Sequence, residues 1–114
     1  MRVIICGSRD WDDYTKIREY VETLPKDTII IEGGARGADK LARNAAIQCG
    51  LKYETYNANW DRYGRSAGPK RNQEMLDSGA ALVVGFRKNM SRGTTDMLDR
   101  AAKAGTPTKI VDIP

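Results

Sequence analysis

The chain has 114 residues, a net charge of +4, and 30% charged and 40% hydrophobic residues. This size fits a single domain over residues 1–114, and the composition excludes a disordered chain. No apolar stretch approaches the ~20 residues that a membrane-spanning helix needs, and no signal peptide is visible, so we expect a cytoplasmic protein without a membrane partner.

Short apolar runs alternate with segments of helical period along the whole chain. The runs predict strands over residues 3–6, 28–31, 53–56, 81–84 and 109–113. Apolar residues at helical spacing predict a helix between successive strands, the first closed by Pro25 and the others ending near Gly50, Gly79 and Gly105. A long polar loop is expected over residues 58–68, before the third helix.

Strict alternation of strands and helices, with strands that are apolar throughout, is typical of a parallel sheet covered on both faces. Right-handed crossovers then give an α/β fold, a Rossmann-like doubly wound sheet of about five strands with helices on both faces. In such a sheet the ligand binds outside the carboxyl ends of the strands. The segments that follow the strands are therefore the candidate functional segments.

The segment after the first strand contains Gly7, Ser8 and Arg9. Glycine permits a tight turn, serine offers a hydroxyl, and arginine carries a planar fork of donors that fits phosphate. The alternative is an ordinary strand-to-helix turn in which Asp10 or Asp12 caps the first helix.

The segment after the second strand is rich in small residues and opens a helix. Backbone N–H groups exposed at a helix start form an anion site, so we expect ligand contacts here. The loop is neither a Walker A loop nor a GxGxxG motif. Asp39 either accepts from a sugar hydroxyl or caps the helix. The candidate ligand residues are Gly33, Gly34, Ala35, Arg36, Gly37 and Asp39.

Three further segments complete the set of candidates. Trp60 lies among arginines in the long loop, where it either stacks on a base or packs the loop onto its own domain. Arg71 and Asn72 follow Gly68-Pro69 at a helix start, and the alternative there is a solvated helix end. After the fourth strand and Gly85-Phe86-Arg87, a helix opens with Gly93, Thr94, Thr95 and Asp96, and this helix start supplies amides and hydroxyls for a ligand. The alternative for this segment is a plain capping box.

Histidine is absent, which removes the commonest metal ligand and general base. Cys6 and Cys49 lack metal-type spacing and fit small buried side chains in a reducing compartment. We expect neither a metal nor a cofactor.

The chain resembles the YspA-type branch of the SLOG superfamily, which is related to the DprA/Smf and LOG-type Rossmann-like proteins. Four motifs carry the resemblance: Gly7-Ser8-Arg9, Gly33-Gly34-Ala35-Arg36-Gly37-Ala38-Asp39, Gly68-Pro69-x-Arg71-Asn72-x-x-Met75 and Gly93-Thr94-Thr95-Asp96-Met97. The resemblance implies a Rossmann-like fold that binds nucleotides or nucleotide-derived ligands. It also favours a homodimer, which an exposed apolar helix face would support.

The Gly93 segment is similar to the phosphate loop of LOG phosphoribohydrolases, which usually reads Pro-Gly-Gly-x-Gly-Thr with a glutamate downstream. Ser91-Arg92-Gly93-Thr94 departs from that pattern, and Asp96 is the candidate stand-in for the carboxylate.

Three functions follow from these observations. The first is binding, as a sensor or sequestering protein, of a nucleotide-like small molecule such as an ADP-ribose-like compound. The second is hydrolysis of an N-glycosidic or phosphoribosyl bond, with Asp96 or Asp39 as the catalytic carboxylate. The third, less favoured, is binding of single-stranded nucleic acid, suggested by the kinship with DprA and by Trp60, Tyr63 and nearby arginines.

Overall fold

The computed structural model describes residues 1–88 and 91–113 and has five parallel strands in the order β3-β2-β1-β4-β5. This confirms the Rossmann-like doubly wound sheet. In chain order the elements are β1 (Arg2–Gly7), α1 (Tyr14–Glu22), β2 (Ile29–Glu32), α2 (Ala38–Gln48), β3 (Lys52–Thr55), α3 (Trp60–Tyr63), the 3-10 turn η1 (Gly64–Ser66), α4 (Ala67–Asp77), β4 (Leu82–Lys88), α5 (Arg92–Lys103) and β5 (Thr108–Ile113).

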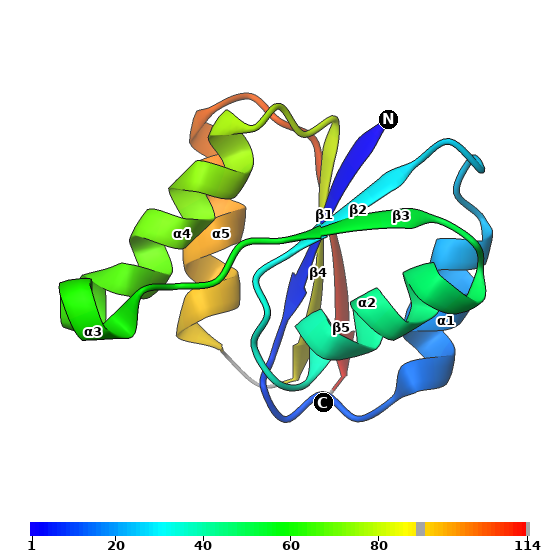
Figure 1. The fold of residues 1–114 in the computed structure, drawn as a ribbon, viewed down its shortest axis with the longest axis horizontal. Coiled ribbons are helices and arrows are strands. Elements are labelled where there is room, and N and C mark those ends of the chain that lie inside the picture. The colour runs from blue at the N-terminus through cyan, green and yellow to red at the C-terminus, as the bar shows by residue number, and fades with distance from the viewer. Residues whose placement is uncertain (89–90, 114) are drawn as a thin grey trace.

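Helices cover both faces of the sheet: α1 and α2 pack on one face, and α4 and α5 on the other (Figure 1). The central strand β1 shows why its sequence is apolar throughout. Val3 and Ile5 join the core under α1 and α2, whereas Ile4 and Cys6 join the core under α4 and α5. Because side chains alternate between the faces of a strand, a strand buried on both sides needs an uninterrupted apolar run.

Strand β4 is longer than the sequence indicated. We expected a strand over 81–84 followed by Gly85-Phe86-Arg87, but β4 continues to Lys88. It pairs with β5 from Val83 to Lys88, with Phe86 opposite Val111 and Arg87 opposite Asp112. The two strands are also joined by an ion pair between Arg87 Nε and Asp112 Oδ1 at 2.8 Å.

Two local expectations were wrong. The segment 58–68 is not a continuous loop, because it holds α3 and η1, and α4 begins at Ala67. Asn59 starts α3 by accepting from the backbone N–H of Arg62. The cap of α1 is neither Asp10 nor Asp12 but Asp13, whose carboxylate accepts from the N–H of Lys16.

The reversal of strand order lies between β1 and β4. The chain proceeds from β1 outward through β2 to β3, and then crosses back to place β4 on the other side of β1. At such a reversal the connections leave the carboxyl ends of the two strands in opposite directions, which opens a crevice between them.

Among the helices that the structure describes, none has the length and apolar character needed to span a membrane.

Candidate functional site

A cavity of about 690 Å³ lies at the carboxyl ends of β1 and β4. Cys6 and Gly7 contribute to it from β1 and Lys88 from β4, while Met75 of α4 and Thr94 of α5 come from the helices over one face. Its volume is within the range of pockets that enclose whole small ligands. The structure therefore has a ligand-sized cavity at the place where the strand order predicts one.

The end of β1 is held tightly to its neighbours. A Cβ atom at Gly7 would collide with the carbonyl oxygen of Phe86 and with the side chain of Ala38. The hydroxyl of Ser8 donates to the carbonyl oxygen of Lys88 at 3.0 Å and accepts from its N–H at 2.9 Å. Ser8 thus joins the ends of β1 and β4. It also lines the cavity, and the ligand contact that the sequence suggested stays a prediction.

Two buried carboxylates accept hydrogen bonds from backbone N–H groups of the glycine-rich loop after β2. The N–H of Gly34 donates to Glu32 Oε1 at 3.2 Å, and the N–H of Ala35 donates to Asp39 Oδ2 at 3.2 Å. Gly37 has a φ of +78° and approaches the backbone of Ser8. The loop is therefore held in place by its own acidic side chains, and these two N–H groups do not form the anion site expected from the sequence.

Asp39 is 6% exposed and lines the cavity. Burial raises the pKa of its carboxyl group from 3.8 to about 7, against the opposing effects of the Arg71 guanidinium and of the N–H groups of Ala35 and Gly33. Near neutral pH this aspartate is therefore partly protonated, so it can donate as well as accept a hydrogen bond.

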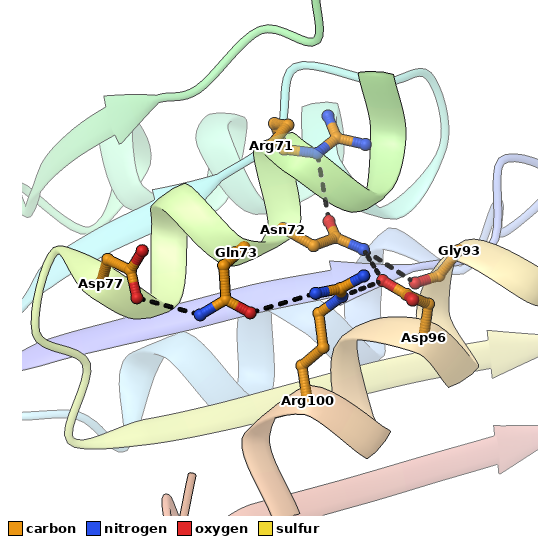
Figure 2. Close-up of polar contacts among 7 residues, drawn as sticks. All are labelled: Arg71, Asn72, Gln73, Asp77, Gly93, Asp96 and Arg100. Atoms are coloured by element: carbon orange, nitrogen blue, oxygen red, sulfur yellow. Dashed lines mark hydrogen bonds and ion pairs between the residues drawn. The ribbon is translucent and has the colours of Figure 1, made fainter. Parts of the chain in front are cut away.

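A chain of polar side chains joins α4 to α5 beside the cavity (Figure 2). Asn72, which is buried, accepts from Arg71 Nε at 3.1 Å and donates to the carbonyl oxygen of Gly93 at 3.2 Å and to Asp96 Oδ2 at 3.0 Å. Asp96 also pairs with Arg100 Nε at 2.9 Å. One amide side chain thus fixes the direction of an arginine, a carboxylate and the first turn of α5.

Arg71 is held from a second side as well. Its guanidinium donates to the carbonyl oxygen of Gly33, and a Cβ atom at Gly33 would collide with it. Glycine at this position therefore lets the guanidinium lie directly against the loop after β2. Arg71 connects α4 to that loop at the wall of the cavity.

The short helix α3 lies beside the start of α4 (Figure 1) and carries Trp60. The indole is 48% exposed, lines the cavity and packs near Gly68. The guanidinium carbon of Arg9 lies 5.7 Å from the centroid of the Trp60 ring, within the range of a cation–π contact. An exposed aromatic face and an arginine thus border the same opening.

The charges around the cavity are mixed. Acidic side chains come from Asp10, Asp39 and Asp96, and basic side chains come from Arg9, Arg65, Arg71, Lys88 and Arg92. Helix α5 also opens without a side-chain cap at Ser91, so the N–H groups of its first turn add positive potential at the cavity. In residues 1–88 and 91–113 no group of three or more His, Cys, Asp or Glu side chains could hold a metal ion.

Comparison with known proteins identifies the family. Residues 1–63, more than half of the chain, match the family described as "YspA, cpYpsA-related SLOG family". The chain belongs to this SLOG family. It is 36% identical over 117 residues to the "Gene 61 protein" of Mycobacterium phage D29, an alignment that covers 93% of this chain and 92% of the phage protein.

The SLOG fold assignment also agrees with a solved structure, that of DNA processing protein A (DprA) from Streptococcus pneumoniae. The TM-score is 0.62 at 17% sequence identity, so this likeness shows the fold alone. The match covers 96% of this chain and 58% of the DprA chain, and the SLOG chain therefore spans little more than half of that protein.

Most of the residues singled out in the sequence of this SLOG chain come together in space. The large cavity is lined by Gly7, Ser8, Arg9, Ala35, Asp39, Trp60, Arg71, Asn72, Gly93, Thr94 and Asp96. A smaller adjoining cavity adds Gly33, Gly34 and Arg36. Gly37 and Thr95 line neither cavity. Gly37 lets its loop lie against the backbone of Ser8 and Arg9, where a Cβ atom would collide. The Thr95 hydroxyl is buried without a partner among the described residues.

Several lining residues escaped the sequence reasoning. Lys88 was missed because β4 was expected to end four residues earlier. Cys6 was assigned to the core, yet it also lines the cavity, where burial raises the pKa of its thiol and keeps it protonated. Gly68 and Met75 were named in a family motif but not among the candidate ligand residues. They line the cavity from the same helix face as Arg71 and Asn72, at i, i+3 and i+4 spacing.

Among the residues that the structure describes, the exposed large apolar side chains do not form one helix face. Ile47 belongs to α2, Tyr53 to β3 and Ile110 to β5, whereas Trp60 and Tyr63 share α3. Nothing in this distribution supports the homodimer suggested by the sequence, which stays a prediction.

Proposed function

We propose that this SLOG chain binds a nucleotide or a nucleotide-derived small molecule in the cavity between β1 and β4. The observation that carries the proposal is the combination of an exposed indole, cationic side chains and carboxylates around one ligand-sized cavity. A nucleotide offers a matching partner for each of these groups: a flat base, a phosphate and sugar hydroxyls.

The parts of the ligand are assigned by chemistry. Trp60 and Arg9 present an aromatic face and a planar cation at the opening, and both stack well on a base. Lys88, Arg92 and the first turn of α5 offer positive charge for a phosphate. The buried carboxyl group of Asp39 is suited to a ribose hydroxyl because it can accept or donate a hydrogen bond.

Calorimetric titration against ribonucleoside monophosphates, diphosphates and ADP-ribose tests the proposal. We expect Arg9→Gln to weaken binding at least tenfold, since an arginine–phosphate or arginine–base contact contributes about 1.5–3 kcal/mol. Arg18→Gln is the matched control, because Arg18 pairs with Glu22 on the outer surface of α1, away from the cavity. The proposal fails if none of these compounds binds at millimolar concentration.

A second candidate function is hydrolysis of the N-glycosidic bond of a nucleotide. It is favoured by the presence of two aspartates, Asp39 and Asp96, at one cavity, and by the pKa of about 7 at Asp39. A carboxyl group that holds its proton near neutral pH is suited to general acid catalysis. In this reaction water adds to the anomeric carbon, the bond to the base breaks, and Asp39 protonates the departing base while Asp96 accepts the proton of water.

The hydrolase function is tested by incubating the protein with nucleoside monophosphates and measuring the free base released by chromatography. Asp39→Asn and Asp96→Asn should each abolish release, and unchanged release in either variant would remove that residue from the mechanism.

A single-stranded oligonucleotide in the binding panel tests the third function, binding of single-stranded nucleic acid. Its affinity should fall steeply with salt if DprA-like nucleic-acid binding is correct.

A further inference from the structure

A second cavity of about 490 Å³ adjoins the first at the ends of β2 and β3. The two cavities share Arg9, Ala35, Trp60 and Arg71 as lining residues, so we treat them as two lobes of one site. Because the first lobe is by itself large enough for a small ligand, the second provides room for a further part of the same molecule.

The second lobe differs from the first in its charge. Its side chains include the guanidinium groups of Arg9, Arg36 and Arg71 and the amide of Asn57. No acidic side chain lines it among residues 1–88 and 91–113. The nearby carboxylate of Glu32 is buried behind the loop, where it pairs with Arg43 Nη2 at 3.1 Å. The second lobe is therefore suited to an anion.

Two glycines form its wall. Gly33 leaves space for the guanidinium of Arg71, and Gly34, with a φ of +72°, leaves space for the amide of Asn57, since a Cβ atom at either position would collide with that side chain. These glycines allow two polar side chains to lie directly against the backbone of the loop. The lobe is thus shaped by the loop itself and not only by long surface side chains.

We propose that the second lobe holds the terminal phosphate of a nucleotide that carries at least two phosphates. This inference rests on the proposed function, because it places the base and ribose in the first lobe. The phosphate nearer the ribose keeps its contacts with Lys88, Arg92 and the first turn of α5. Arg71, which borders both lobes, lies between this phosphate and the terminal one. Arg36 and Asn57 then contact the terminal phosphate, and no acidic side chain of the described part of the chain lies opposite its remaining negative charge.

The test compares AMP, ADP and ADP-ribose by calorimetry in the wild type, Arg36→Gln and Arg92→Gln, with thermal unfolding as the check on folding. We expect ADP to bind the wild type about tenfold more tightly than AMP, the effect of one charge-assisted contact. Arg36→Gln should reduce the ADP-to-AMP affinity ratio toward one. Arg92→Gln should weaken both nucleotides and retain the ratio, because Arg92 lines only the first lobe.

Three results would overturn the inference. If AMP and ADP bind the wild type equally, the second lobe does not take a phosphate, although the proposed function stands. If ADP-ribose binds more tightly than ADP and this advantage depends on Arg36, the lobe takes a neutral sugar instead. If no nucleotide binds, the inference and the proposed function fail together.

Discussion

Asp39→Asn should change how the stability of the fold depends on pH. The pKa of Asp39 is about 7 in the folded chain, against 3.8 for the free side chain, because burial disfavours the charged form. At pH values below 3.8 the carboxyl is mostly neutral in both the folded and the unfolded chain, so its ionisation does not change the free energy of unfolding. As pH rises from 4 to 7 the unfolded chain releases this proton while the folded chain retains it, so stability falls, and above pH 7 the loss is complete.

The difference of about three pKa units corresponds to about 4 kcal/mol of unfolding free energy between pH 4 and pH 8. Asparagine keeps an oxygen for the N–H of Ala35 and carries no titratable charge. Urea unfolding at five pH values measures the effect. Over this range we expect the free energy of unfolding of the wild type to fall by about 4 kcal/mol more than that of Asp39→Asn. The control is Asp10→Asn, at an exposed carboxylate of the same cavity, whose free energy of unfolding should follow that of the wild type. Parallel curves for the wild type and Asp39→Asn would refute the reasoning.

Three other predictions concern the same cavity. Gly7→Ala should destabilise the fold by about 1–3 kcal/mol in urea unfolding, because the added methyl group meets the backbone of Phe86; an unchanged midpoint would contradict this. Asn72→Ala should weaken nucleotide binding by about tenfold in calorimetry, because it releases Arg71 and leaves polar groups unpaired, and equal affinity would show that Asn72 does not position the site. Nucleotide affinity should fall as pH rises through about 7, because ionised Asp39 offsets the charge of Arg71, and Asp39→Asn should remove this dependence; a persisting pH profile would assign it to another group.

The fold could be predicted from the sequence because its signals are local. Uninterrupted apolar runs such as residues 3–6 report a strand buried on both faces, and the glycines after Cys49, Ser78 and Ala104 all have positive φ at helix ends. The location of the site followed from the fold, since the carboxyl ends of parallel strands lie at one edge. The residues at which strands end were harder to predict from the sequence. Strand β4 extends past Val84 because β5 pairs with it, and that partner is distant in the sequence.

The sequence could not show which groups accept hydrogen bonds from the backbone N–H groups of the glycine-rich loop. Small residues at a helix start are compatible with a phosphate site and also with a loop closed by its own carboxylates. The second arrangement is present at Gly34 and Ala35, because the fold places Glu32 and Asp39 beside their N–H groups. Composition and spacing are the same in both cases, and only the three-dimensional path of the backbone separates them.

This difference changes the chemistry expected of the site. If the loop amides bound the phosphate, any compact anion would be a sufficient ligand. With those amides occupied, positive charge comes instead from arginines around both lobes. Asp39, which already accepts from the N–H of Ala35, remains in the larger lobe as a carboxyl group that can form a further hydrogen bond with a hydroxyl of the ligand. An inorganic anion would satisfy the arginines and leave Asp39 without a new partner. A molecule that carries both hydroxyls and phosphates satisfies both, and for this reason the mixed charge of the cavity favours a nucleotide over a simple anion.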